Sequence, residues 1–481
     1  MPFDVFARWR PLPASAEGEI TRTHSPFEDA RGTHISTSLT PPPPLSKTIR
    51  PWKSGAIFTH VFEAANTSHN RAVFDVVVAP ILPRVLAGET ANFLAYGHSG
   101  SGKSHTMIGY DFQNEDQFGL CLAAGREVFQ SLSSLSEGGD QLGVGISMYE
   151  LRGNTAFDLL NRAGSSQEKV PCHIREGPDG QTHIRGETET FADGRVRVRP
   201  ITQKPCWAFD ELRAALLSGL ELRATGTSTI HDQSSRTHAV LELEIITKSL
   251  LDARDAVIER QSELVPVAKR ATDIYLEENT KAFIQDKDGK YVPNPEYSIN
   301  QGRIDEAEAK KAEFEIAVKR AEEGVDAVFA SCGYECLGGK LVFVDLAGSE
   351  YYHDKSMSTP TGGPAARVKQ TPQEQREGRQ INTDLLALKE VIRARALGQA
   401  RIPYRSSPLT MVLRGHFESS SSSTPNESSK GRKQSGSEGY TAMILTVSPA
   451  ATQFAATMNT LKYGNLVGVG VQAAGENAGK K

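Results

Sequence analysis

The stretch Gly97-His98-Ser99-Gly100-Ser101-Gly102-Lys103-Ser104 decides the fold of this chain, because it matches the pattern G-x-x-x-x-G-K-[ST]. Glycines in such a loop let backbone N–H groups turn inward around phosphate oxygens. Lys103 would reach the β- and γ-phosphates, and the Ser104 hydroxyl would ligate Mg²⁺. An apolar run at 91–96 precedes the loop, and no proline interrupts the residues that follow it. This strand–loop–helix order predicts a nucleoside triphosphate site.

Two later segments supply the other groups that such a site needs. Val344-Asp345-Leu346-Ala347-Gly348-Ser349-Glu350 follows an apolar run, so Asp345 is placed to hold the Mg²⁺ shell and Gly348 to donate an N–H to a γ-phosphate. Ser234-Ser235-Arg236-Thr237-His238 lies between a predicted helix and a predicted strand, where small hydroxyls suit a loop that senses phosphate and metal. The guanine-reading motif N-K-x-D is absent from the sequence, which argues against a GTPase.

Together these motifs resemble the kinesin motor domain family. Residues 102–107 resemble the family's G-K-T/S-x-T-M, residues 231–238 its N-x-x-S-S-R-S-H with two changes, and residues 345–350 its D-L-A-G-S-E without change. Arg8-Trp9-Arg10-Pro11 is similar to the adenine-side R-x-R-P, and Phe74 aligns with an aromatic that stacks on adenine. Asn382 and the segments 403–405 and 459–463 match later family segments in the right order, so the resemblance covers about residues 3–465.

The resemblance implies ATP and Mg²⁺ as ligands and assigns roles to individual residues. Ser104, Ser235 and Asp345 would hold Mg²⁺, while Ser234 and Gly348 would position the γ-phosphate and the attacking water. Arg236 and Glu350 would form an ion pair that closes the two switch loops over ATP; an ordinary surface salt bridge is the alternative. The nucleotide itself would be bound by Arg8, Arg10, Pro11, Phe74, Gly97, His98, Ser99, Gly100, Ser101, Gly102, Lys103, Ser104 and His105.

Two histidines depart from the family pattern. His231 stands where the family usually has Asn, and His98 replaces a frequent Gln. A histidine still donates a hydrogen bond, but its shape and titration differ. The histidine at position 231 is expected to affect the rate of hydrolysis more than nucleotide binding.

Hydrophobic patterns predict an α/β sheet flanked by helices. The resemblance implies that this is the P-loop NTPase kinesin motor fold, with a central, mostly parallel twisted sheet. The expected strands and helices alternate along the chain. The strands are 91–96, 239–246, 341–344 and 441–447, and the helices are 122–132, 209–222 and 380–397. We expect one motor domain over residues 1–470.

Several segments fall outside this pattern. Residues 248–337 are rich in Ala, Glu and Lys, with helical spacing at 303–329 and a helix-prone stretch at 250–265. They predict an inserted antiparallel helical hairpin, or alternatively one helix with flexible flanks. Proline-rich residues 12–50 suit an exposed loop, the serine-rich stretch 418–439 a disordered loop, and residues 471–481 a flexible tail.

Composition narrows the partners and the compartment. A net charge of −4 over 481 residues argues against a nucleic-acid-binding protein. The five scattered cysteines indicate free thiols in a reducing compartment. No signal peptide and no apolar run long enough for a membrane are present in the sequence. We therefore expect a soluble intracellular protein that does not bind membranes, and the resemblance implies a place in the cytoplasm, at the cytoskeleton.

By resemblance, the expected function is a microtubule-binding ATPase that moves along or depolymerises microtubules. Residues 385–393 and 157–161 are similar to the internal-motor, depolymerising kinesins, but residues 12–55 lack their Lys-Val-Asp triplet. A nucleotide-regulated, non-motile module that binds microtubules or another protein is the alternative. We expect a monomer, because Gly464, Gly468, Gly470 and Gly475 would break a dimerising helix after Tyr463.

The filament-binding face predicts weak binding to tubulin. The family commonly has I-N-K-S-L and P-Y-R-x-S-K-L-T there, whereas this chain has Thr383 and Pro408 at the two lysine positions. Asp384 is expected to add a negative charge to the same face. Arginines at 379, 393, 395, 401, 405 and 414 could compensate if they share one face.

Overall fold

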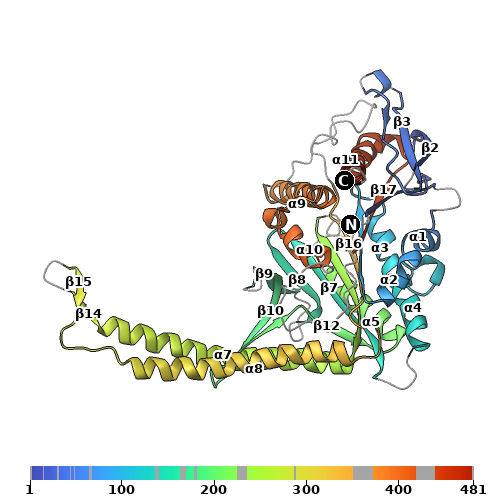
Figure 1. Cartoon of the computed structure of the whole chain (residues 1–481). Helices are drawn as coiled ribbons and strands as arrows, with labels where there is room; N and C mark the ends of the chain where they lie inside the picture. Colours follow the sequence, from blue (N-terminus) through green and yellow to red (C-terminus); the bar gives the residue numbers. More distant parts are fainter. Residues whose placement is uncertain are drawn as a thin grey trace.

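The computed structural model describes residues 3–14, 16–29, 32–43, 45–47, 49–63, 68–135, 140–162, 169–177, 181–224, 236–285, 289–349, 372–418 and 439–478. A large twisted sheet is flanked by helices on both faces, and a long helical hairpin projects from it (Figure 1). The α/β architecture agrees with the expectation from the sequence, but the sheet is mixed rather than mostly parallel.

The central sheet has the strand order β11-β10-β9-β8-β7-β13-β16-β6-β17-β1-β5, and β12 pairs with β7. Neighbours from β16 to β5 run parallel, whereas those from β11 to β16 run antiparallel. Only Gly153 and Asn154 separate β7 from β8, and so short a connection can join only antiparallel strands. The strands are β1 Phe3–Trp9, β5 His60–Phe62, β6 Thr90–Tyr96, β7 Leu142–Arg152, β8 Thr155–Arg162, β9 Lys169–Glu176, β10 Thr182–Thr190, β11 Val196–Pro200, β12 Gln203–Cys206, β13 His238–Thr247, β16 Lys340–Asp345 and β17 Tyr440–Val447.

Two hydrophobic clusters hold the helices against the two faces of the sheet. On β6, Phe93 belongs to one cluster and Leu94 to the other, because successive side chains of a strand point to opposite faces. Helices α1, α4 and α5 contribute to the first cluster and α9, α10 and α11 to the second. The helices are α1 Asn70–Val77, α2 Leu82–Leu86, α3 Lys103–Met107, α4 Leu120–Ser133, α5 Phe209–Ala224, α9 Pro372–Ala396, α10 Pro408–Glu418 and α11 Phe454–Ala478.

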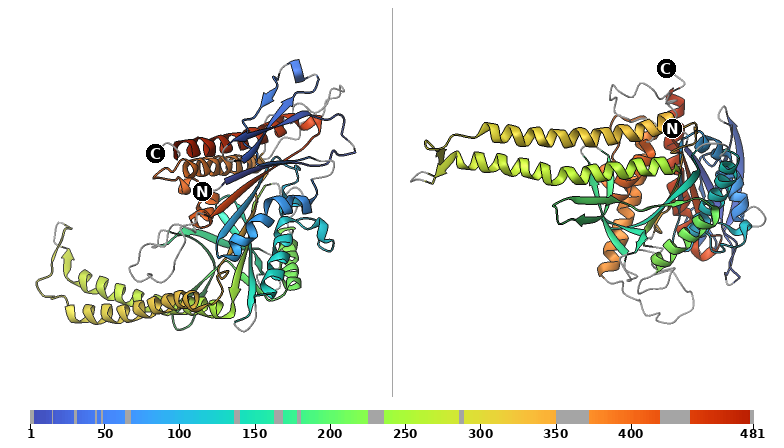
Figure 2. Two further views of the ribbon diagram at one scale, coloured as in Figure 1. Left: turned by 45° about the vertical axis from the view of Figure 1, so that its right-hand side comes forward. Right: turned by 90° about the horizontal axis from the view of Figure 1, so that it is seen from below.

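The hairpin consists of α7 (Lys248–Lys281) and α8 (Gln301–Ser331), joined at its tip by the short strands β14 (Phe283–Gln285) and β15 (Tyr291–Pro293). The two helices lie side by side in all three views (Figures 1 and 2). The hairpin leaves the sheet between β13 and β16, the strands that adjoin the two predicted switch segments. Both ends of the hairpin are therefore joined to strands that carry the predicted switch segments.

Ion pairs hold the half of α7 that is nearest the sheet against the sheet. Arg254 of α7 pairs with the buried Glu244 of β13 at 2.8 Å, and Glu259 pairs with Arg195 at 2.7 Å and with Arg197. The side chain of Pro266 lies next to Gly194, where an added Cβ would meet it at 3.5 Å. The first half of α7 is thus attached to the core, and the remainder projects away from it (Figure 2).

Two expectations about the termini of the domain differ from the structure. Residues 21–40 form the hairpin β2 (Thr21–Asp29) and β3 (Gly32–Thr40), which pairs with β4 (Trp52–Lys53). Leu39 and Thr37 are buried on one face, as an alternating β-branched pattern allows. Residues 419–438 of the expected disordered loop lie outside the described residues.

At the other end, α11 continues to Ala478 through all four glycines that were expected to break it. Gly464 has no room for a side chain, because an added Cβ would lie 2.1 Å from Leu445 Cδ1. Gly468 is similarly close to Ile57. These glycines let the helix approach the sheet closely, and packing outweighs their low helix propensity. Within the described ranges, every helix is too short or too polar to cross a bilayer.

Candidate nucleotide site

The phosphate loop lies at the carboxyl end of β6 and leads into α3. Gly100 and Gly102 have φ values of 72° and 106°, a region that residues with a side chain rarely adopt. Gly97 lies so close to β17 that an added Cβ would be 2.3 Å from the Thr446 carbonyl oxygen. Ser101 shares a 2.7 Å hydrogen bond with the Thr446 hydroxyl. The loop is therefore held against β17 in a conformation that requires its glycines.

Lys103 folds back onto the loop that precedes it. Its Nζ donates to the carbonyl oxygens of Gly97 and His98 at 3.0 and 2.9 Å, and its side chain is buried. A phosphate in the loop would compete with these carbonyls for the ammonium protons. Lys103 is thus already positioned at the place where the motif predicts the β- and γ-phosphates.

Ser104 and Asp345 come together as the sequence predicts for a Mg²⁺ site. The Ser104 hydroxyl donates to Asp345 Oδ2 at 2.6 Å. The other carboxylate oxygen, Oδ1, is buried and has no hydrogen-bond partner among the described residues. A buried carboxylate oxygen beside a serine hydroxyl fits a hard cation that binds oxygen. The residues therefore fit the magnesium that the resemblance implies.

Arg223 is a third member of this cluster that the sequence analysis missed. Its Nη1 lies 3.1 Å from Asp345 Oδ2, and both side chains are almost completely buried. Arg223 lies near the end of α5, just before the switch segment, and no spacing pattern connects it with Asp345. The buried carboxylate is therefore balanced by a guanidinium in this arrangement.

The second switch segment contacts the phosphate loop at Gly348 and Ser349. An added Cβ on Gly348 would lie 2.9 Å from the backbone nitrogen of Ser99, so a larger residue would push the two segments apart. The Ser349 N–H donates to the Gly97 carbonyl at 3.1 Å. This contact places Gly348 beside the loop, as its predicted γ-phosphate role requires.

The first switch segment is described only from Arg236 onward. Arg236 Nη1 lies 3.9 Å from the carboxylate of Glu377 on α9, and Arg152 pairs with the same carboxylate at 2.7 Å. His231, Ser234, Ser235 and Glu350 lie outside the described residues. Their predicted roles, including the Arg236–Glu350 ion pair, remain predictions.

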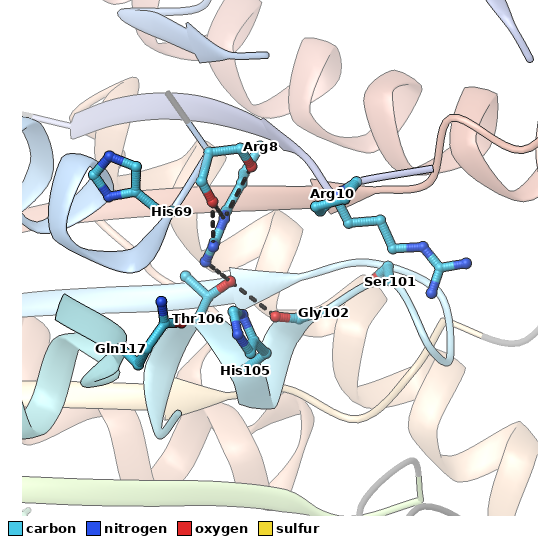
Figure 3. A pocket seen from close by; sticks show the side chains of 10 residues that line it. Arg8, Arg10, His69, Ser101, Gly102, His105, Thr106 and Gln117 are labelled. Carbon is cyan, nitrogen blue, oxygen red and sulfur yellow. Dashed lines mark hydrogen bonds between the residues drawn. The ribbon is translucent and has the colours of Figure 1, made fainter. Parts of the chain in front are cut away.

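A pocket of about 290 Å³ opens beside the phosphate loop (Figure 3). Arg8 lines it, donating to the Thr106 hydroxyl at 2.7 Å and to the Ser68 carbonyl at 3.1 Å. Burial lowers the pKa of Arg8 to about 10, so it remains charged at neutral pH. The pocket is lined by Arg8, Arg10, Pro11, Ser68, His69, Ser101, Gly102, His105, Thr106 and Gln117. Its size and position suit the base of a bound nucleotide.

Most of the predicted adenine-side residues line this pocket, but Phe74 does not. Arg10 donates to the Gly100 carbonyl at 2.5 Å, which connects the pocket with the phosphate loop. Burial and the nearby Arg8 lower the pKa of His105 to about 4, so its ring is neutral at pH 7. Phe74 is 1% exposed and packs in the core cluster under Arg71. Direct stacking of Phe74 on adenine is not supported, because its ring faces the core.

His98 is enclosed within the phosphate loop. Its Nδ1 lies 2.8 Å from the Ser99 carbonyl oxygen, which makes Nδ1 the protonated nitrogen. Burial is the main cause that lowers its pKa to about 4. His98 therefore serves as a neutral hydrogen-bond donor to its own loop, as the Gln that it replaces could also do.

The predicted filament face lies on α9 and on the segment leading into α10. Thr383 is exposed and Pro408 is half-buried at the first position of α10. Asp384 is only 3% exposed, so its expected contribution of negative charge to this face is wrong. One helical position separates Thr383 from Asp384, and that rotation of about 100° moves the carboxylate from the surface to the interior.

The six arginines of this region do not all face solvent. Arg379, Arg393 and Arg401 are exposed, whereas Arg395 donates to the Tyr404 hydroxyl at 2.7 Å. Arg405 and Arg414 both pair with Glu176 of β9, at 2.6 and 3.4 Å. The positive charge available on the surface is therefore smaller than the sequence alone indicates.

Comparison with known proteins shows to which family the chain is similar. The family model described as the kinesin motor domain matches residues 44–268 and 313–424. The kinesin-like protein KIN-4B of Arabidopsis thaliana is 27% identical over 427 residues, covering 85% of this chain and 30% of that protein. KIF27 of Rattus norvegicus is 25% identical over 416 residues, covering 85% and 21%. The chain thus spans less than a third of these relatives, and they do not support the similarity to internal-motor kinesins.

Solved structures show the same fold. A kinesin motor whose mutants reveal a signalling pathway for ATPase activation has a TM-score of 0.54 and 18% identity, covering 97% of this chain and all of that chain. A fast kinesin has a TM-score of 0.53 and 19% identity, covering 97% of this chain and 91% of that one. Since the family model matches more than half of its residues, the chain belongs to the kinesin motor domain family.

Proposed function

We propose that this chain is a Mg²⁺-dependent ATPase whose turnover is coupled to microtubule binding. The observation that carries the proposal is the 2.6 Å contact between Ser104 of the phosphate loop and Asp345 of the second switch segment. It lies next to a pocket lined by Arg8 and His105, which suits a purine base. The phosphate and base subsites are connected through Arg10 and Gly100.

In the proposed reaction, the chain mainly positions the phosphates and stabilises charge. Lys103 would exchange its two carbonyl partners for β- and γ-phosphate oxygens, and Ser104, Ser235 and Asp345 would hold the metal. Bound Mg²⁺ would supply positive charge to the β- and γ-phosphates. Gly348 would donate its N–H to the γ-phosphate, and Ser234 would orient the attacking water.

Closure of the site would depend on the two switch segments. Arg236 and Glu350 would pair and hold both segments over the nucleotide. Loss of the γ-phosphate would release them, as in other P-loop switches. Because α9 follows the second switch segment and presents Arg379, Thr383 and Arg393 on its surface, that release would alter the filament face.

The residues of the filament face favour weak binding to microtubules. Thr383 and Pro408 replace the two family lysines, and Glu176 partly neutralises Arg405. The same observation favours the second candidate, a nucleotide-regulated binding module without motility. Its nucleotide site would be the same, but filaments would not stimulate turnover.

Steady-state ATP hydrolysis, with and without taxol-stabilised microtubules, tests the proposal. We expect slow Mg²⁺-dependent turnover that rises with microtubule concentration. Turnover that microtubules leave unchanged would support the binding module. No binding of a fluorescent ATP analogue at all would contradict both candidates.

A further inference from the structure

His238 lies where the two switch segments and α9 meet. It is the first residue of β13 and is only 2% exposed. Its Nδ1 lies 3.0 Å from the backbone nitrogen of Ala347 in the second switch segment. A backbone N–H can only donate, so Nδ1 must carry a lone pair. The single ring proton of a neutral imidazole is therefore on Nε2.

Nε2 faces a carboxylate from α9. Asp384 Oδ2 lies 3.7 Å away, and the Asp384 side chain also accepts a 3.0 Å hydrogen bond from Gln380 through Oδ1. In the family sequence that this segment resembles, the corresponding residue is serine. This chain thus places a buried carboxylate where a small neutral hydroxyl is usual.

The separation of 3.7 Å is slightly too long for a hydrogen bond. His238 Nε2 has no hydrogen-bond partner among the described residues. Both side chains line a pocket of about 240 Å³ between α9 and the turn after β7. The other charged residues lining it are Arg152, Arg236, Arg376 and Glu377. The pocket leaves room for α9 to approach β13.

We propose that Asp384 is a positioning residue that couples α9 to both switch segments through His238. An approach of about 1 Å would let Nε2–H donate to Asp384 while Nδ1 keeps its bond to Ala347. A carboxylate on one ring nitrogen holds the imidazole in one tautomer, as in catalytic triads. The hydrogen bond forms in only one arrangement of α9, and such a differential contact shifts a conformational equilibrium.

This inference rests on the proposed function, because it assigns the closed arrangement to the ATP-bound state. Loss of this hydrogen bond should therefore affect binding of an ATP analogue more than binding of ADP. Asp384→Ser should weaken binding of AMPPNP relative to ADP about tenfold, because the lost contact is a hydrogen bond to a charged group. Asp384→Asn should lose less, since its amide oxygen can still accept from Nε2. Glu390→Ser removes a half-exposed carboxylate from the same helix and should leave the ratio unchanged.

Two measurements test the coupling in the whole chain. Titration with fluorescent analogues of ADP and AMPPNP gives the affinity ratio for the wild type and the three variants. Imidazole ¹⁵N spectra of the wild type report the tautomer without any substitution. We expect His238 protonated at Nε2 with both nucleotides, and an Nε2–H signal moved downfield by AMPPNP.

An unchanged affinity ratio in Asp384→Ser, or protonation of His238 at Nδ1, would overturn the coupling while leaving the ATPase proposal intact. Failure of the wild type to bind either nucleotide would instead refute the proposed function, and the coupling with it. Should Asp384→Ser not fold, the near-isosteric Asp384→Asn and the wild-type spectra still decide the matter.

Discussion

Ser104 and Asp345 are 241 positions apart in the sequence, yet Ser104 Oγ lies 2.6 Å from Asp345 Oδ2. The contact joins the start of α3, just after the loop that follows β6, to the end of β16. The strands β6 and β16 are adjacent and parallel. Parallel strands place their carboxyl ends at one edge of a sheet, where α/β proteins usually bind ligands. The two strands therefore bring the phosphate loop and the second switch segment to one site.

Replacing Lys103 with alanine should lower ATP turnover at least about 100-fold, because a preorganised charge at the transferred phosphate is lost. Steady-state hydrolysis with microtubules measures this effect. The matched control is Lys310→Ala, which removes an exposed lysine from α8 and should leave turnover unchanged. Wild-type turnover in Lys103→Ala would show that the phosphate site has been assigned wrongly.

Acid should destabilise the protein partly through His98. Burial lowers its folded-state pKa to about 4 from 6.5, so the unfolded chain binds the extra proton between these values. Above pH 6.5 the ring is neutral in both the folded and the unfolded chain. As the pH falls toward 4, protonation of the unfolded chain progressively lowers the free energy of unfolding. At pH 5.5 this loss is about 1 kcal/mol. Thermal unfolding from pH 7.5 to 5.5 should therefore show a smaller drop in Tm for His98→Gln than for the wild type. An equal fall of Tm with pH in both proteins would mean that the pKa of His98 is the same in the folded and the unfolded chain.

The sequence alone located the phosphate loop, Asp345 and four strands of the sheet, because these depend on short motifs and continuous apolar runs. It missed Arg223, since a pair formed by distant segments leaves no local pattern. It misplaced Asp384, because one helical position decides between surface and interior. The Phe74 prediction came from alignment, which does not show that the ring faces the core. The continuation of α11 through Gly464 and Gly468 depends on close packing against distant residues.

Deleting residues 252–335 and closing the gap with a short linker should leave ATP binding intact. The insertion joins β13 to β16, which pair directly through the sheet. The variant should nevertheless be less stable, because the buried Glu244 loses its partner Arg254. Deleting only 269–312 retains Arg254 and Glu259 and should restore that stability. Nucleotide titration and thermal unfolding of both variants check these outcomes, and loss of ATP binding in both would show that the hairpin belongs to the core.

The double change Thr383→Lys and Pro408→Lys should tighten microtubule binding about fivefold at low salt, because each surface contact contributes about 0.5–1 kcal/mol. The gain should shrink as salt rises, since exposed charges are screened beyond about 10 Å at 0.1 M. Thr383→Gln with Pro408→Gln has similar side-chain length without charge and serves as the control. Equal affinity of both variants across a salt series would show that this face does not contact the filament.

If nucleotide state controls microtubule affinity, cosedimentation with microtubules should reveal the difference. The wild-type chain is mixed with microtubules in AMPPNP and, separately, in ADP, and the bound fraction is measured over a range of tubulin concentrations. We expect tighter binding in AMPPNP than in ADP, with both affinities falling as salt is added. Equal binding in the two nucleotides, or no binding in either, would contradict it.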